Sequence, residues 1–178
     1  MSEHDPRCEG GTGSEQKLLD DVAEYGWHVM KVLDQDGAPG WAYSIGLYRN
    51  FAHPEILVFG LDIDLMHAMI NSIGEEARSG RTFGVDLKYP GLIEAYSCTF
   101  KMVDPVWYEV FLGFATWFYH GSRFPVLQCF WPDFDANFPW EPDFSEELRR
   151  AQPMLFHADP ERARVNELLR LLDSDPPG

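Results

Sequence analysis

The apolar and polar positions of the first sixty residues change between helical and strand spacing. Residues 14–26 place apolar side chains on one helical stripe and end at Gly26, which is typical of an amphipathic helix. Residues 27–33 and 41–47 are rich in strand formers and flank an Asp-Gln-Asp-Gly turn, which predicts an antiparallel hairpin. In the run EILVFG at residues 55–60 every residue after Glu55 is apolar, which is typical of a central strand.

The middle of the chain predicts a helix, a strand and a second, very apolar helix. Asp62 or Asp64 caps the first helix, which ends near Gly80. Its inward-facing residues are predicted to be Leu65, Met66, Met69, Ile70, Ile73 and Ala77. Residues 92–103 alternate as one strand, with one face made of Tyr96, Cys98, Phe100 and Met102. Asp followed by Pro opens the second helix, which is predicted over residues 104–120.

The remaining elements complete an α+β order. Residues 124–131 predict a last strand, and residues 132–142 form a proline-rich turn segment. A short amphipathic helix opens at Asp159, with Val165, Leu168, Leu169 and Leu172 on one side. Hairpins mixed with helices indicate a single α+β domain, with a largely antiparallel or mixed sheet and helices packed against it.

Length and local composition divide the chain into three parts. Residues 1–13 lack apolar periodicity and are predicted to be a flexible leader. Residues 14–144 form the core domain, and residues 145–178 a C-terminal extension with the short helix.

The charge balance excludes some partners. Lys and Arg total 14 against 29 Asp and Glu, a formal charge of −15. Such a surface repels polyanions, so no nucleic acid and no anionic membrane is expected, whereas a basic protein is a suitable partner. Three cysteines and an N-terminus without the pattern of a signal peptide predict a reduced, cytoplasmic setting.

The first of two aromatic-rich blocks, residues 40–55, carries the candidate chemistry of the N-terminal half. His53 lies between two predicted strands and could move a proton, with Glu55 orienting its ring. The simpler alternative is that His53 bonds backbone groups in a turn fixed by Pro54. Ser44 lacks the GxSxG context of a serine hydrolase. The candidates for ligand or partner contact in this block are Trp41, Tyr43, Ser44 and His53.

In the second block, residues 125–141, Asp133 stands just after the predicted strand. That side chain either caps loop amides or faces a cleft shared with His53. The spacing Asp-x-Asp-x-Asn is not a calcium loop, because Phe138 stands where a Gly is needed and the twelfth position is not Glu. The candidates for contact here are Gln128, Trp131, Asp133 and Trp140.

The other His and Cys residues have simple structural interpretations. His28 and His67 are predicted on a strand face and a helix surface, and Cys129 as a small core residue. Neither a metal site nor a cofactor is predicted, because zinc ligand spacing and the glycine-rich phosphate loops are absent from the sequence.

Both blocks resemble a bacterial family of uncharacterised proteins, domain of unknown function 4262. The matching pieces occur in order over roughly residues 15–141: Gly26-Trp27, the run from Ala42 to Leu47, His53-Pro54-Glu55, Gly60, Gln128, Trp131-Pro132-Asp133 and Pro139-Trp140. The resemblance implies a small single-domain bacterial protein and transfers no catalytic residue. Ser44 stands where Thr is expected in many members, which keeps the hydroxyl group.

Three functions fit this sequence. The favoured one is a non-catalytic binding protein, of immunity or antitoxin type, that meets a basic partner through an acidic, aromatic-rich surface. The alternatives are a small-molecule enzyme, with His53, Glu55 and Asp133 as catalytic candidates and Tyr43 orienting the substrate, or a ligand sensor that uses the same cleft without turnover. Partner identity and oligomeric state are not predicted.

Overall fold

The computed structural model describes residues 13–173, so the predicted leader lies outside the described residues except for its last position. The centre is a six-stranded sheet with strand order β1-β2-β3-β6-β5-β4. The strands are β1 (His28–Val32), β2 (Trp41–Ile45), β3 (Glu55–Phe59), β4 (Lys88–Ile93), β5 (Tyr96–Met102) and β6 (Val126–Phe130). The β3–β6 pair is parallel and every other pair is antiparallel, so the predicted mixed sheet is confirmed.

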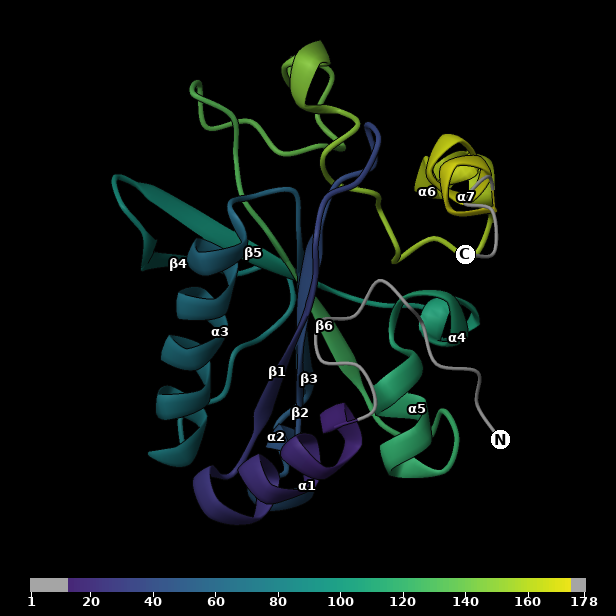
Figure 1. Cartoon of the computed structure of the whole chain (residues 1–178). Helices are drawn as coiled ribbons and strands as arrows, with labels where there is room; N and C mark the ends of the chain where they lie inside the picture. The colour runs from purple at the N-terminus through teal and green to yellow at the C-terminus, as the bar shows by residue number, and fades with distance from the viewer. Residues whose placement is uncertain (1–12, 174–178) are drawn as a thin grey trace.

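Helices cover both faces of the sheet. The longer ones are α1 (Ser14–Tyr25), α3 (Ile63–Arg78), α5 (Gly113–Tyr119) and α7 (Asn166–Asp173), and the shorter ones are α2 (Leu47–Phe51), α4 (Tyr108–Phe111) and α6 (Pro160–Ala163). Within residues 13–173 there are also the short 3₁₀ helices η2 (Pro105–Trp107), just before α4, and η3 (Glu146–Leu148), between β6 and α6. Helix α3 lies along one face, whereas α4, α5 and the α6–α7 pair lie on the other (Figure 1). The predicted single α+β domain is therefore confirmed.

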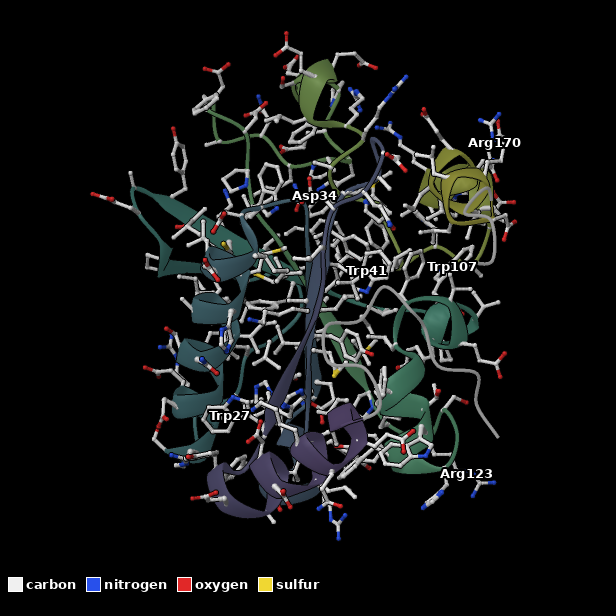
Figure 2. All side chains as sticks on the ribbon, viewed as in Figure 1. Trp27, Asp34, Trp41, Trp107, Arg123 and Arg170 are labelled. Carbon is white, nitrogen blue, oxygen red and sulfur yellow. The ribbon has the colours of Figure 1, made fainter. Side chains whose placement is uncertain are left out.

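Strand alternation divides the core into two layers. On the α3 side the sheet contributes Val29, Ala42, Ile56, Val58, Cys98, Phe100, Leu127 and Cys129. On the other side it contributes Met30, Val32, Trp41, Tyr43, Ile45, Leu57, Phe59 and Val126. Figure 2 shows the same division among tryptophans, since Trp27 lies toward α3 while Trp41 and Trp107 lie toward α4. Both faces are buried, which explains why every residue of EILVFG after Glu55 is apolar.

The prediction of one strand over residues 92–103 is wrong in its extent. Two strands, β4 and β5, form a hairpin there, and its turn holds Ala95 at φ 69°. Cys98 and Phe100 are buried as predicted, but Met102 is 45% exposed because it lies at the end of β5. Leu65 on α3 is also exposed (40%) rather than inward-facing. The alternation of polar and apolar residues predicted which side chains of this segment are buried, but it did not predict where each strand ends.

The prediction of one helix over residues 104–120 is also wrong. The segment is split at Leu112, whose φ and ψ are −129° and 39°. The Trp41 Nε1–H donates to Phe111 O (2.9 Å), and the Tyr43 hydroxyl accepts from Phe114 N–H (3.3 Å). In an unbroken helix those backbone groups would pair within the helix. Two buried side chains of β2 therefore take over the hydrogen bonds at the break.

The segment after the second block packs on the same core. Leu155, Ala163, Val165 and Leu168 belong to the core layer that includes β2 and α4. The predicted helix start at Asp159 is confirmed, because its carboxylate accepts from Arg162 N–H. The helix is broken at Arg164, which has φ 57°. Among the described residues, none of the helices is both long and apolar enough to cross a membrane.

Candidate functional site

The structure separates His53 from Asp133. Strands β3 and β6 run in parallel, with Glu55 opposite Val126. His53 precedes β3 and Asp133 follows β6, so the two residues lie at opposite ends of the strand pair. The loop after β6 is at one end of the sheet and α2 is at the other (Figure 1). The shared cleft that the enzyme and sensor alternatives require is therefore not formed by these two residues.

His53 is enclosed in a turn, as the simpler alternative held. Its Nδ1–H donates to Pro54 O (2.8 Å), and its Nε2 accepts from Phe83 N–H (3.2 Å). These two bonds define a neutral tautomer, since one nitrogen donates and the other accepts. Burial lowers the pKa of His53, and the bond to Pro54 O only partly opposes this. With 3% of its surface exposed, the ring joins the segment before β3 to the segment before β4.

Glu55 forms the densest polar network in the described residues, and His53 is not part of it. One carboxylate oxygen accepts from Gly46 N–H (2.8 Å), Tyr48 N–H (3.2 Å) and Tyr119 O–H (2.5 Å). The other accepts from Ser44 O–H (2.6 Å). Burial raises the pKa of Glu55, while these four donors oppose the shift by stabilising the carboxylate.

Ser44 links this network to the sheet. Its Oγ donates to Glu55 and accepts from Ile56 N–H (2.9 Å), so the hydroxyl is used in both directions. The polar residues of the first block thus hold the β2–α2–β3 connection together. Their side chains are buried: Ser44 is 0% and Glu55 1% exposed. A Thr at position 44 would supply the same hydroxyl.

Asp133 caps a loop, which is one of its two predicted roles. One carboxylate oxygen accepts from Asp135 N–H (3.0 Å) and Asn137 N–H (2.9 Å). The other accepts from Ser145 N–H (2.9 Å), twelve positions along the chain. Burial pushes the pKa of Asp133 upward, but the three backbone donors outweigh it and hold the pKa below its ordinary value. The side chain fixes both ends of the loop.

The other contact candidates of the second block also face inward. Gln128 is fully buried, donates to Pro153 O (2.7 Å) and accepts from Leu155 N–H (3.3 Å). The Trp131 Nε1–H donates to Phe59 O (2.7 Å). Trp140 is half-buried, stacked on Phe138 with an interplanar angle of 7°. These residues attach the C-terminal segments to the sheet. A polar residue such as Gln128 within an otherwise apolar strand is the sequence signal that could have indicated this structural role.

One residue of the second block does face solvent, and the sequence reasoning did not single it out. Phe134 is 85% exposed, whereas the next most exposed large apolar side chain among the described residues, Tyr25, is 58% exposed. It lies in residues 132–147, named here the acidic loop, which contains six acidic residues and neither Lys nor Arg. The acidic loop projects from one end of the sheet (Figure 1).

A pocket of about 470 Å³ lies beside the edge strand β1, between α1 and α3. The residues with polar side chains that line it are Lys17, Asp21, Tyr25, Trp27, His28, Lys31, His67, Asn71, Glu75 and Arg78. Sequence reasoning placed His28 and His67 on separate elements and missed that α3 brings them together. This pocket is called the β1-edge pocket below.

The described residues hold no group of three or more His, Cys, Asp or Glu side chains in a metal-binding arrangement. Cys129 is a buried core residue on β6, as predicted, and Cys98 beside it is likewise a free, buried thiol. Burial and the neighbouring Cys98 thiol raise the pKa of Cys129 well above its ordinary value. The raised pKa keeps the Cys129 thiol protonated, and the side chain serves as a core group.

Fold and site together define a single-domain α+β protein whose motif residues support its framework. The family model named Domain of unknown function (DUF4262) matches residues 21–145. The chain belongs to this family, so the resemblance seen in the two blocks is confirmed. Searches of the curated proteins and of the solved structures give no significant match.

Proposed function

We propose that this protein is a non-catalytic binding protein that holds a basic partner protein against its acidic loop, with Phe134 as the anchor. The observation that carries the proposal is the 85% exposure of Phe134 on a loop that is tied down at both ends. Aromatic anchors surrounded by polar rims supply much of the binding energy at protein interfaces.

The loop backbone is ordered before any partner arrives. Besides the three bonds to Asp133, Phe138 N–H donates to the Glu141 carboxylate (2.6 Å), and Asp133 N–H donates to Asn137 O (2.9 Å). Ala136 takes the left-handed conformation, with φ 64°, which closes the turn tightly. Ordering in advance lowers the entropy cost of binding, so Phe134 is presented in a fixed position.

The charge around Phe134 selects a basic surface. Asp135, Asp143, Glu146 and Glu147 are exposed on the acidic loop. Arg149 pairs with Glu146, so Asp135, Asp143 and Glu147 are the acidic groups assigned to the partner. Charge complementarity of this kind raises the association rate and excludes acidic competitors. A partner whose basic functional surface is covered in this way would be inhibited, which is the immunity or antitoxin role.

One further feature supports this choice over the enzyme and sensor alternatives, and another supports the place of action. The side chains of the catalytic candidates His53, Glu55 and Asp133 already form hydrogen bonds with groups that hold the fold together. The free, buried thiols Cys98 and Cys129 suit a reduced compartment, so the proposed place of action is the cytoplasm.

The test is a comparison of captured partners. Wild-type protein and the variants Phe134→Ala and Val106→Ala are used as baits at equal concentration, and captured proteins are quantified by mass spectrometry. Val106, on η2, is 57% exposed and lies outside the acidic loop, so it controls for loss of any exposed apolar group. We expect one stoichiometric basic protein that binds the wild type and Val106→Ala and is lost with Phe134→Ala.

A charge variant tests the second half of the proposal. Asp135→Lys combined with Asp143→Lys is expected to slow association with the captured partner at low salt, with little change at high salt. Capture that is unchanged by both variants, or a stoichiometric partner that is acidic, would contradict the proposal.

A further inference from the structure

The β1-edge pocket collects nitrogen bases in a protein that is acidic overall. Its lining includes three permanent cations, Lys17, Lys31 and Arg78, and two carboxylates, Asp21 and Glu75. The pocket therefore carries a formal charge of +1 before its two histidines are counted, against −15 for the whole chain. Its volume of about 470 Å³ lies within the range of about 300–1,000 Å³ that small-molecule sites show.

The basic groups are close enough to act on one another. Burial lowers the pKa of His67, and the charges of Lys31 and Lys17 lower it further, with Asp64 opposing them. Burial also lowers the pKa of His28, and both Lys17 and His67 contribute to the lowering. Bases from α1, β1 and α3 thus line one space, where Lys17 pairs with Asp21 and Arg78 with Glu75, and the two lysine charges disfavour the protonated form of His67. An anion placed between them would remove that penalty.

Asp21 sets the direction of the His28 ring. Its carboxylate accepts from Lys17 Nζ (2.9 Å) and lies 2.7 Å from His28 Nδ1. With Nδ1–H directed to Asp21, the remaining ring nitrogen, Nε2, is the atom available to a ligand. Asp21 also stabilises the protonated ring, so an anion at Nε2 would complete a carboxylate–imidazolium–anion arrangement.

The other wall of the pocket suits an apolar group. Trp27 and Val29 line it, and the Trp27 Nε1–H is held by Asn71 Oδ1 (3.0 Å). The Arg78 guanidinium, which also lines the pocket, lies 4.7 Å from the Trp27 ring centroid. A ligand with a charged head and a flat apolar body would match both halves of the cavity.

We infer that the β1-edge pocket binds a small phosphate monoester, with the phosphate between Lys17, His28, Lys31 and His67 and the organic group beside Trp27. Lysines bind phosphate as point charges, and imidazolium N–H groups add charge-assisted hydrogen bonds. The pocket is larger than a free phosphate requires, which is why an ester is inferred rather than the inorganic ion. This site is separate from the acidic loop and does not depend on the function proposed for it.

The probes are phenyl phosphate, inorganic phosphate and phenol, titrated into the full chain at constant ionic strength by calorimetry. Phenyl phosphate is expected to bind in a saturable manner and about tenfold more tightly than inorganic phosphate, while phenol does not bind. The imidazole signals of His28 and His67, followed by NMR, are expected to titrate at higher pH with phenyl phosphate present. Equal binding of phenol, or unchanged titration of both histidines, overturns the inference.

Variants locate the site. His67→Gln removes one charged donor from the helix surface and is expected to weaken phenyl phosphate binding about tenfold. The matched control is Arg150→Gln, in a second cationic hollow of about 530 Å³ lined by Arg149, Arg150, Arg164 and Arg170. If His67→Gln binds phenyl phosphate as tightly as wild type, or if only Arg150→Gln loses affinity, phenyl phosphate does not bind in the β1-edge pocket and the inference is overturned. Melting curves without ligand confirm that both variants fold.

Discussion

At the end of the sheet where β3 begins, Glu55 accepts four hydrogen bonds inside the protein. At the end where β6 finishes, Asp133 accepts three, and the loop that it ties down faces solvent. Both carboxylates accept hydrogen bonds from backbone N–H groups that lie outside the hydrogen-bond ladder of the sheet. The two ends differ in what that order presents: the first end encloses the hydrogen-bonded network of Glu55, whereas the second displays Phe134. A polar motif residue can therefore support a binding surface without touching the ligand.

The largest effect is expected at the enclosed end. Glu55→Gln keeps one acceptor oxygen but brings an NH₂ group against N–H and O–H donors, which leaves buried groups unpaired. We expect a loss of about 3 kcal/mol in the free energy of unfolding. Urea unfolding measures it. Ser44→Ala removes one of the four donors and serves as the milder control, with an expected loss of about 1–2 kcal/mol. A Glu55→Gln protein as stable as wild type would show that the network is not structural.

The second effect depends on pH. His53→Gln keeps an acceptor for Phe83 N–H and loses the bond to Pro54 O, so we expect a loss of about 1–2 kcal/mol near pH 7.5. Because burial lowers the folded-state pKa of His53, its contribution is fully present above the unfolded-state pKa and is lost as pH falls through the window below about 6.5. Glutamine does not titrate. The stability gap between wild type and variant should narrow from pH 7.5 to 5, and a widening gap would refute the neutral tautomer.

The third effect is local to the displayed end. Asp133→Ala removes the acceptor for three backbone N–H groups, those of Asp135, Asn137 and Ser145. Hydrogen exchange at these three amides is expected to accelerate, while exchange in β3 and β6 stays slow. Binding to the captured partner should weaken although Phe134 is still present. Unchanged exchange would show that the loop is held by its other bonds.

The smallest effect on stability is expected where the effect on binding is largest. Phe134→Ala changes a side chain that is 85% exposed, so the free energy of unfolding should change by no more than about 0.5 kcal/mol. The affinity for the partner should fall at least about tenfold. Urea unfolding and affinity measurements on the same variant distinguish the effect on stability from the effect on binding. A large loss of stability would place the ring in the core rather than at an interface.

Local pattern predicted most of the elements. The α3 helix, its Asp62 cap, the β1–β2 hairpin and the apolar strand β3 all followed from spacing and turn residues. The break at Leu112 did not, because nothing in the sequence around it forbids a helix. Trp41 and Tyr43 supply its backbone partners from a strand about seventy positions earlier. A helix break of this kind depends on side chains that are distant in sequence.

The candidate sites show the same limit. The sequence indicated His53, Glu55 and Asp133 as catalytic candidates, with turn and capping roles as the alternative for His53 and Asp133, and in the structure each makes several hydrogen bonds. Only the enzyme and sensor alternatives placed His53 and Asp133 in one cleft. The parallel register of β3 and β6 places one before its strand and the other after it, at opposite ends of the pair. Strand direction depends on chain crossovers, which local sequence does not encode.

The two aromatic-rich blocks determined by themselves that this chain builds a buried α+β framework, because alternating and continuous apolar runs must be covered on both faces. They also determined the family. Only the tertiary structure decided which aromatic residue faces solvent and that α3 brings His67 beside His28. The reason is physical: exposure and convergence depend on distances between elements far apart in sequence, and these are set when the elements pack.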